Sequence, residues 1–446
     1  MTHGSRPHIS QALMLMGIDR HVLYRYSIWI GMLDFTDKPY RYYPPEPNLL
    51  LIWIFRQWNR FVHLPGREHL IEDVTVDNPR ELKPCAGSRI MFLPNHATHS
   101  DPQIMMEVQR QVGVPSMFMA AYDLFERSRF RAWVMQKSGV FSVDREGSDS
   151  QAMKQAINTL VDGRYALTVF AEGNVYLMND RVTPFLDGAA FMAMKAQKKL
   201  GPETPVYVVP VSIKVTHTSD RRRAIRDLIG QVAEGAGVTF DRQADPVVEL
   251  KKIGVEVLKK KLSQQGYFPP QTGTEDIPLL LDQAAGMIIA ALEEKMELKA
   301  RDKDDLVTRI RKIRQGIHRI RIDPEKSVVC STAASWAEEA ILAFRILMYS
   351  GRYLDDSPTM DRFGETAEKL VEDLYGKAVP PYGRRRARVR FGVPRSLAEC
   401  LDDFKRNARR VIADLTPGFE QAVQEGLDKL NTENSYPGGE RLTDLS

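Results

Sequence analysis

Between residues 88 and 215 the chain alternates short apolar stretches with stretches of helical period, and this alternation restricts the fold most strongly. The expected strands cover 88–96, 114–121, 140–144, 165–173 and 205–215, and the expected helices cover 101–113, 129–139 and 150–163. The β-branched and apolar residues of 165–173 and 205–215 are typical of buried parallel strands. Strands that alternate with helices imply an α/β fold, so we expect a mixed, mostly parallel sheet flanked by helices.

One short loop after the first expected strand holds most of the candidate chemistry. It runs from Asn95 and His96 to Asp101. Ligands of α/β sheets bind at the carboxyl ends of strands, where the ends of 88–96, 140–145 and 165–173 should meet. Histidine is the side chain whose unperturbed pKa lies nearest neutral, and Asp101 could hold one ring nitrogen of His96 so that the other faces a substrate hydroxyl. Taken alone, the same pattern also fits a structural histidine with satisfied hydrogen bonds.

Further motifs follow this loop in order, each within or at the end of an expected strand. They are Arg145, then Phe170 with Glu172 and Gly173, and then Pro210. Together with Asn95, His96 and Asp101, this ordered set resembles the glycerolipid acyltransferase family, whose best-known members are the 1-acylglycerol-3-phosphate acyltransferases. The resemblance covers roughly residues 85–215, which is less than a third of the chain.

The resemblance implies an acyl transfer. A fatty acyl group would move from an acyl thioester, either acyl-CoA or acyl carrier protein, to a hydroxyl of a glycerol-based phospholipid precursor such as 1-acylglycerol-3-phosphate. His96 would be the general base, oriented by Asp101, and the candidate substrate-binding residues are Asn95, Arg145, Glu172 and Gly173. Arg145 would hold the acceptor phosphate, Glu172 would orient the acceptor or support Arg145, and backbone N–H groups near Gly173 would bind the oxyanion. The resemblance implies no metal and no cofactor beyond the acyl donor.

The third motif departs from the family pattern. Ala171 stands where the family usually has proline, and Asn174 and Val175 stand where threonine and a basic residue usually follow. Arg181 or Lys195 could supply the missing cation. Two other functional classes remain open: a hydrolase of acyl thioesters or lipids that uses the same His/Asp pair to activate water, and a non-catalytic lipid-binding protein.

The segments around the core suggest a division of the chain into regions. Residues 1–65 form an N-terminal amphipathic or interfacial helical region, with aromatic and aliphatic stretches at 22–36 and 48–64 joined by an extended linker. Trp58 and Phe61 recur near helical spacing with Leu50, Leu51 and Ile54, which suits a helix lying in a membrane interface or one packed on its own domain. The acyltransferase core is expected over 66–216.

Residues 217–383 read as a large all-helical insertion in the core. Helices are expected over 278–300 and 305–322, which pair as a hairpin, and over 335–349. A late strand and C-terminal helices over 384–431 would complete the core, and 432–446 would be a flexible tail. The late strand carries Arg384, Arg385, Arg386, Arg388, Arg390 and Arg395 without an acid. This basic cluster is either a solvated face or a contact for anionic lipid headgroups or coenzyme A phosphates.

Charge and cysteine usage exclude several classes. Lys and Arg number 62 and Asp and Glu 58, a net charge of +4 that gives no indication of nucleic-acid binding. The cysteines, Cys85, Cys330 and Cys400, lie far apart, which argues against a disulfide scaffold or zinc ribbon. We expect no secretory signal and no transmembrane helix. The expected location is therefore cytoplasmic and peripheral, on the inner face of the membrane.

Overall fold

The computed structural model describes residues 40–147, 149–271, 276–299, 301, 304–321 and 330–444. The aromatic stretch 22–36 lies outside the described residues. Within the described ranges, no helix is both long enough and apolar enough to cross a membrane.

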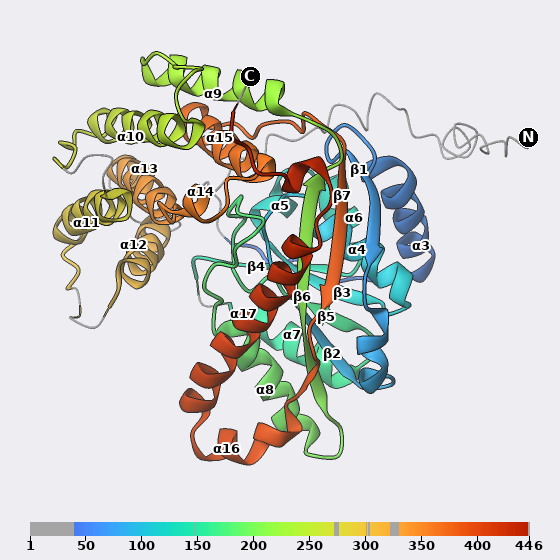
Figure 1. Cartoon of the computed structure of the whole chain (residues 1–446). Helices are drawn as coiled ribbons and strands as arrows, with labels where there is room; N and C mark the ends of the chain where they lie inside the picture. Colours follow the sequence, from blue (N-terminus) through green and yellow to red (C-terminus); the bar gives the residue numbers. More distant parts are fainter. Residues whose placement is uncertain are drawn as a thin grey trace, which may run out of the picture.

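An eight-stranded sheet forms the centre of the structure (Figure 1). Its strands are β1 (Ile71–Val76), β2 (Arg89–Pro94), β3 (Ser116–Ala121), β4 (Val140–Val143), β5 (Ala166–Thr168), β6 (Val206–His217), β7 (Arg385–Phe391) and β8 (Arg395–Ser396). They lie in the order β1-β7-β6-β2-β5-β3-β4, with β8 beside β6. Only β6–β7 and β6–β8 are antiparallel among the strand pairs of the described chain. The predicted mixed, mostly parallel sheet is therefore confirmed.

Helices cover both faces of the sheet. They are α4 (Asp101–Val112), α5 (Asp123–Glu126), α6 (Arg129–Lys137), α7 (Ser150–Asp162), α8 (Gly188–Leu200), α16 (Leu401–Arg406) and α17 (Ala408–Thr432). Successive side chains of a strand point to opposite faces. Met91 and Leu93 of β2 accordingly belong to the apolar cluster with α7, α8 and α17. Ile90 and Phe92 belong to the cluster with α4 on the other face.

Helix α17 crosses β6 at close range (Figure 1). The Ser212 hydroxyl donates to the carbonyl oxygen of Val423 at 2.7 Å. A Cβ atom at Gly426 would lie only 2.1 Å from Ser212 Oγ. Glycine is therefore required at position 426 for the C-terminal helix to reach the sheet.

The helical insertion occupies the place of a hairpin loop. Strands β6 and β7 are antiparallel neighbours, and the register pairs His217 with Arg385. The insertion therefore leaves and re-enters the sheet at adjacent residues. This geometry lets a long segment interrupt the core while the strands before and after it still pair.

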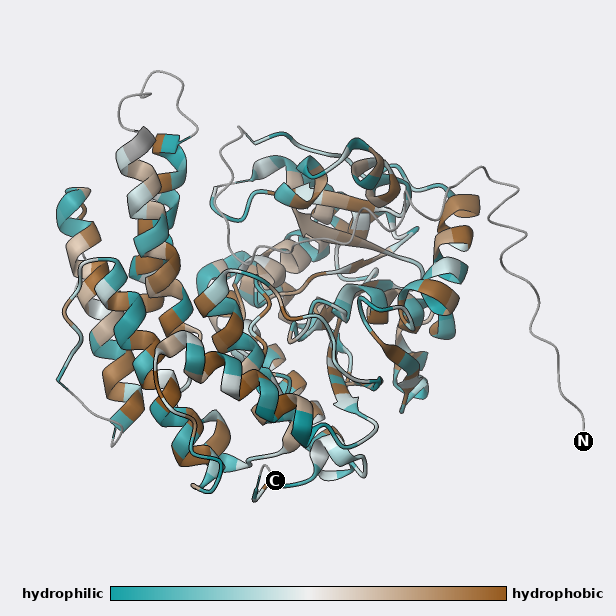
Figure 2. Cartoon of the chain, turned by 90° about the horizontal axis from the view of Figure 1, so that it is seen from above, coloured by the Kyte–Doolittle hydropathy of each residue, from teal (hydrophilic) through white to brown (hydrophobic). Residues whose placement is uncertain are grey.

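The insertion itself consists of helices that pack in two apolar clusters. They are α9 (Arg222–Ala236), α10 (Pro246–Gln264), α11 (Ile277–Lys295), α12 (Leu306–Arg321), α13 (Cys330–Leu347), α14 (Tyr353–Asp356) and α15 (Met360–Tyr375). One cluster joins α10 to α11, α12 and α13, and the other joins α9, α10 and α15. Ile310, Ile313 and Ile317 of α12 are buried in the first cluster, which confirms the predicted hairpin with α11. Figure 2 shows apolar and polar stripes along these helices.

Several arginines of the late strand lie close to acidic side chains, so the predicted basic cluster is only in part an unpaired surface. Arg384 pairs with Glu72 at 2.6 Å, and Arg386 pairs with Asp73. Arg388 pairs with Asp77 and with Glu433, each at 2.6 Å. The acids arrive from β1, which runs beside β7, and from the C-terminal segment. These ion pairs reduce the positive charge of the late strand. Arg385 instead donates to the carbonyl oxygen of His69 and Arg395 to Cys400 Sγ, so a contact with anionic lipid headgroups or coenzyme A phosphates stays a prediction.

The prediction of a flexible tail over 432–446 also needs correction. The backbone of Met360 donates to the carbonyl oxygen of Glu440 at 3.0 Å, and Leu442 donates to Pro358 at 2.7 Å. The Leu442 side chain is buried in the α9–α10–α15 cluster. The described part of the tail, through residue 444, therefore packs against the start of α15.

Candidate active site

The loop after β2 is fixed to the neighbouring strand by an asparagine. Asn95 N donates to the carbonyl oxygen of Val211 at 3.3 Å. The side chain of Asn95 is fully buried, donates to the carbonyl oxygen of Ile213 at 3.0 Å and accepts from Ile213 N at 2.7 Å. Strand β6 extends beyond the end of β2, so this amide satisfies backbone groups that would otherwise lack a partner. Asn95 thus positions the loop, and the prediction that it binds substrate does not fit its burial.

His96 and Asp101 lie together, as the motif predicts. The His96 Nδ1–H donates to Asp101 Oδ2 at 3.0 Å, and the His96 side chain keeps 16% of its surface exposed. The fully buried Asp101 also accepts from Thr98 N at 2.8 Å and from the Thr98 hydroxyl at 2.7 Å. Asp101 is the first residue of α4, where the helix dipole favours a carboxylate. The arrangement fixes the imidazole with Nε2 on the edge opposite the carboxylate.

The ring of His96 is also held by packing. It stacks on Phe170 with ring centroids 4.3 Å apart and an interplanar angle of 30°. Phe170 belongs to the third motif, so this contact joins the loop after β2 to the segment after β5. The two motifs therefore meet at the carboxyl edge of the sheet, where the α/β fold predicts a binding site.

Glu172 supports the backbone rather than a substrate. One carboxylate oxygen accepts from His96 N at 2.6 Å, and the other accepts from Thr183 N at 3.0 Å and from the Thr183 hydroxyl. Burial raises the pKa of Glu172 to about 7, although these hydrogen bonds oppose the shift. The described structure gives Glu172 no contact with Arg145. The predicted roles of Glu172 toward the acceptor or Arg145 are therefore replaced by a role in shaping the loop around His96.

Gly173 provides a tight turn and not an oxyanion donor. Its φ is +79°, and its N–H donates to the carbonyl oxygen of Phe170 at 3.1 Å. A Cβ atom at this position would lie 2.9 Å from Leu186 Cδ1. The N–H that the motif assigns to the oxyanion is already used inside the turn.

Arg145 reaches toward the third motif from the end of β4. Its Nη1 donates to the amide oxygen of Asn174 at 3.0 Å, and its Nη2 lies 3.4 Å from Asp123 Oδ1. The side chain is 32% exposed, so a solvent-borne anion can reach the guanidinium. Asn174, which departs from the family pattern, is thus the residue that orients Arg145.

Another departure from the family pattern, Val175, faces the insertion. Val175 packs against the α10–α13 cluster, and Tyr176 N donates to the carbonyl oxygen of His96 at 3.4 Å. A cavity of about 230 Å³ lies between this segment and helices α12 and α13, lined in part by Tyr176, Thr183 and Phe344. Arg181 lines the cavity and pairs with Asp356, and Arg311 is a second cation there. Lys195 lies on α8 over the ring of Phe191.

Helix α12 of the insertion holds the loop that carries Arg145. Arg314 Nε donates to Glu146 at 3.1 Å, and His318 Nε2 lies 3.3 Å from Asp144 Oδ2. Both acids flank Arg145 in the sequence. The insertion therefore positions the candidate acceptor-binding residue, a contact that sequence analysis missed because nothing in either segment indicates its partner.

A buried ionic cluster fastens the insertion to the core. Asp180 pairs with Lys214 of β6 and, at 2.7 Å, with Arg362 of α15. Asn179 accepts from Val215 N at 3.0 Å and donates to the carbonyl oxygen of the same residue. Asn179 therefore hydrogen-bonds to the backbone of β6 in the same way as Asn95, two residues further along the strand. These residues lie directly after the third motif, and no sequence pattern marks them.

One side-chain group among the described residues has the composition of a metal site. The ligand atoms of His63, Glu68 and His69 lie within 4.8 Å of one another. However, the two histidines share a hydrogen bond of 2.8 Å between their Nε2 atoms, and His69 Nδ1 lies 2.9 Å from Ser100 Oγ. Burial, together with the nearby charge of Arg131, lowers the pKa of His63 to about 4. This cationic surrounding opposes a metal ion, and the chain of hydrogen bonds instead supports the 95–101 loop.

Replacement of Gly173 by alanine tests the turn. At Gly113, whose φ is +72°, an added Cβ atom would have nothing within 4 Å, so Gly113→Ala should cost only the left-handed backbone energy, about 1–2 kcal/mol. Gly173→Ala should lower the thermal unfolding temperature more than Gly113→Ala does, because Leu186 must also move. A Gly173→Ala variant as stable as the wild type would contradict this geometry.

Comparisons with known proteins match the segment of the chain that contains the site. The Acyltransferase family profile matches residues 73–214. Over 131 residues, 29% of this chain and 46% of the relative, the sequence is 29% identical to a 1-acyl-sn-glycerol-3-phosphate acyltransferase of Streptococcus pneumoniae. The match thus spans about half the length of that curated relative.

A solved structure is also similar to part of this chain. The crystal structure of the 1-acyl-sn-glycerophosphate acyltransferase from Thermotoga maritima aligns with 36% of this chain and 57% of its own, at 19% identity and a TM-score of 0.28. The family profile extends from β1 to β6, and the sequence motifs lie within this range, from the end of β2 to β6. Residues 73–214, which form the core of this chain, match the Acyltransferase family.

Proposed function

We propose that this chain is an O-acyltransferase of phospholipid biosynthesis. It moves a fatty acyl group from an acyl thioester, acyl-CoA or acyl carrier protein, to a hydroxyl of a glycerol-phosphate or lysophospholipid acceptor such as 1-acylglycerol-3-phosphate. The observation that carries the proposal is the 3.0 Å contact between His96 Nδ1 and Asp101 Oδ2 on a half-buried ring at the carboxyl edge of the sheet. The family of the core supports the reaction class.

The pair of side chains would act by general base catalysis. Asp101 keeps the proton of the imidazole on Nδ1, so Nε2 accepts the proton of the acceptor hydroxyl. The oxygen then attacks the thioester carbonyl, and the thiolate leaves with the proton that His96 returns. Positioned proton transfer of this kind contributes about 10²–10⁴-fold to a rate.

Arg145 is the proposed acceptor-binding residue. Its present partners are a neutral amide, Asn174, and the carboxylate of Asp123 at 3.4 Å. A phosphate monoester carries more charge than either partner and can accept two N–H groups of a guanidinium at once. The acceptor phosphate would therefore replace or bridge these contacts and place the glycerol hydroxyl near His96.

The membrane contact is proposed for helix α3 (Leu49–Trp58). Leu49, Leu50 and Trp53 are 72%, 66% and 61% exposed, and Phe61 follows in the next turn. Trp133 of α6 is also exposed and meets Phe55 of α3 edge to face at 6.3 Å. An exposed apolar patch on one side of a helix with Arg56 and Arg60 beside it suits an interfacial helix. We propose peripheral binding to the cytoplasmic face of a membrane through this patch.

The transfer chemistry can be tested with purified protein, labelled acyl-CoA and a panel of lysolipids. His96→Ala should lower kcat by about 10²–10⁴-fold, because the base is lost. Arg145→Ala should instead raise the acceptor KM about tenfold or more, since a charge-assisted contact is removed. Full activity of His96→Ala, or thioester cleavage that does not depend on an acceptor, would contradict the proposal.

The contact between α12 and the Arg145 loop predicts a remote effect on acceptor binding. Arg314→Ala should raise the acceptor KM several-fold and leave kcat nearly unchanged, because Glu146 would lose its partner and the loop its anchor. Arg309→Ala is the matched control, since it removes an Arg–Glu pair of the same helix that lies within the insertion. Equal KM values for the two variants would show that α12 does not position Arg145.

Membrane binding can be tested by vesicle co-sedimentation. Leu50→Glu or Trp53→Glu should weaken binding to vesicles of phosphatidylglycerol and phosphatidylethanolamine about tenfold, because burial of such a side chain contributes about 1.5–3 kcal/mol. Val248→Glu is the control: Val248 is 62% exposed on α10, which lies on the opposite side of the sheet from α3 in Figure 1. Unchanged binding of the α3 variants would exclude the patch.

A further inference from the structure

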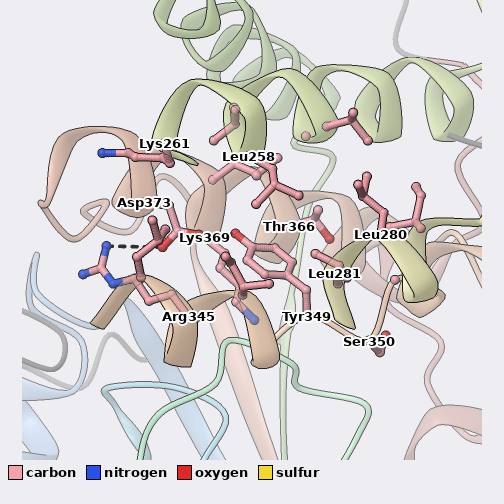
Figure 3. Close-up of a pocket in the computed structure, with 18 of the residues that line it drawn as sticks. Leu258, Lys261, Leu280, Leu281, Arg345, Tyr349, Ser350, Thr366, Lys369 and Asp373 are labelled. Carbon is pink, nitrogen blue, oxygen red and sulfur yellow. Dashed lines mark hydrogen bonds and ion pairs between the residues drawn. The ribbon is translucent and has the colours of Figure 1, made fainter. Parts of the chain in front are cut away.

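The helical insertion contains a cavity that the proposed transfer reaction does not use. It lies where the two apolar clusters of the insertion meet, between helices α10, α11, α13 and α15 (Figure 3). Its volume is about 250 Å³, above the roughly 150 Å³ of an apolar cavity that accommodates benzene. Close packing is the rule in protein interiors, so a space of this size at the junction of helices points to an occupant.

Most of the cavity wall is aliphatic. The wall includes Leu250, Leu258, Leu280, Leu281, Ile341 and Leu370. Gly254 of α10 also lines it, and a Cβ atom there would lie 3.9 Å from both methyl carbons of Leu370, which is ordinary contact. The lining would therefore accept a hydrocarbon chain, and position 254 offers a place from which a longer side chain could fill the same space.

Three charged residues of the cavity lie on one side. Figure 3 shows Lys261, Arg345 and Asp373 opposite Leu280 and Leu281. Asp373 already accepts hydrogen bonds from Arg345 Nη1, at 3.2 Å, and from the Tyr349 hydroxyl. Lys261 Nζ donates only to a backbone oxygen, that of Leu374, at 3.2 Å. The Asp373 carboxylate is therefore already used by Arg345 and Tyr349, and Lys261 has no carboxylate among its hydrogen-bond partners in the described part of the chain.

Lys369 adds a buried cation to the lining. Its Nζ donates to the carbonyl oxygen of Met348 at 2.7 Å and lies 4.1 Å from the centre of the Tyr349 ring. Within the described ranges no carboxylate lies at ion-pair distance from this ammonium. Burial lowers the pKa of Lys369 to about 8, and burial, Glu368 and Asp373 raise that of Glu372 to about 8, so Glu372 supplies little negative charge at neutral pH.

We propose that this cavity binds a single-chain amphiphile with an anionic head, a fatty carboxylate whose head lies beside Lys261 and Lys369 and whose chain lies among the leucines of α10, α11 and α15. The aliphatic wall selects the chain. The lining holds four cations, Lys251, Lys261, Arg345 and Lys369, against two carboxylates, Glu338 and Asp373, and this excess selects the charge of the head. The site lies outside residues 73–214 except for Leu177 and Met178, and the proposal does not rest on transfer activity.

Calorimetric titration of the full chain tests this site, with decanoate as the probe. Decanol and a lysophosphatidate serve as comparison ligands. Decanoate should bind, and Lys369→Met should weaken that binding about tenfold, because a charge-assisted contact is lost. Methionine keeps the length of the side chain, and loss of a buried charge is often tolerated when packing is kept. Binding of decanol should be weaker in the wild type and unchanged by Lys369→Met.

A second variant separates this cavity from the candidate active site. Gly254→Leu should abolish decanoate binding by filling the cavity, whereas Gly230→Leu, on α9 with open space around its Cβ, should not. Thermal unfolding of each variant checks folding. If Gly254→Leu also abolishes the binding of lysophosphatidate, the site accepts a phosphate head as well as a carboxylate. The proposal would be overturned if Gly254→Leu left decanoate binding unaffected. It would also be overturned if the wild type bound decanol as tightly as decanoate, or did not bind decanoate at all.

Discussion

The hydrogen bonds of the Asp101 carboxylate organise the site on which every functional argument depends. Its two oxygens hold Thr98 N, the Thr98 hydroxyl and His96 Nδ1, at the start of α4. These contacts close a loop of six residues and set the plane of the imidazole. Glu172 then holds His96 N from the opposite side, and Phe170 supports the ring. The proposed general base is therefore positioned by groups from two strand ends, and a change in either would move it.

Strand β6 connects this site to the insertion. Beyond the end of β2, its free backbone edge is satisfied by two asparagine side chains, Asn95 at Ile213 and Asn179 at Val215. The first belongs to the catalytic loop and the second to the segment that packs under the insertion. Because the insertion also contacts both neighbours of Arg145, it reaches each of the loops that the transfer chemistry would use. We regard it as part of the acceptor site rather than as an independent appendage.

Features of the fold and of the site that depend on a local sequence pattern can be predicted from the sequence. The strands, the hairpin of α11 and α12, and the meeting of His96 with Asp101 follow from periodicity and from a spacing of five residues. Contacts between distant segments cannot be predicted in this way. The acids that neutralise the arginines of β7, Asp73 and Asp77, lie some three hundred residues earlier and become neighbours only when β1 pairs with β7. The motif alone assigns Glu172 to the acceptor, because its backbone partners, His96 N and Thr183 N, leave no trace in the sequence.

The central claim is that Asp101 keeps His96 in the tautomer whose Nε2 is free to accept a proton. Nitrogen-15 NMR of protein labelled at histidine tests it most directly, with His96→Gln used to assign the signal. At a pH above the titration of the ring, the account predicts a protonated Nδ1 and an unprotonated Nε2 at His96, and a shift toward the other tautomer in Asp101→Asn. A proton on Nε2 in the wild type would contradict the account.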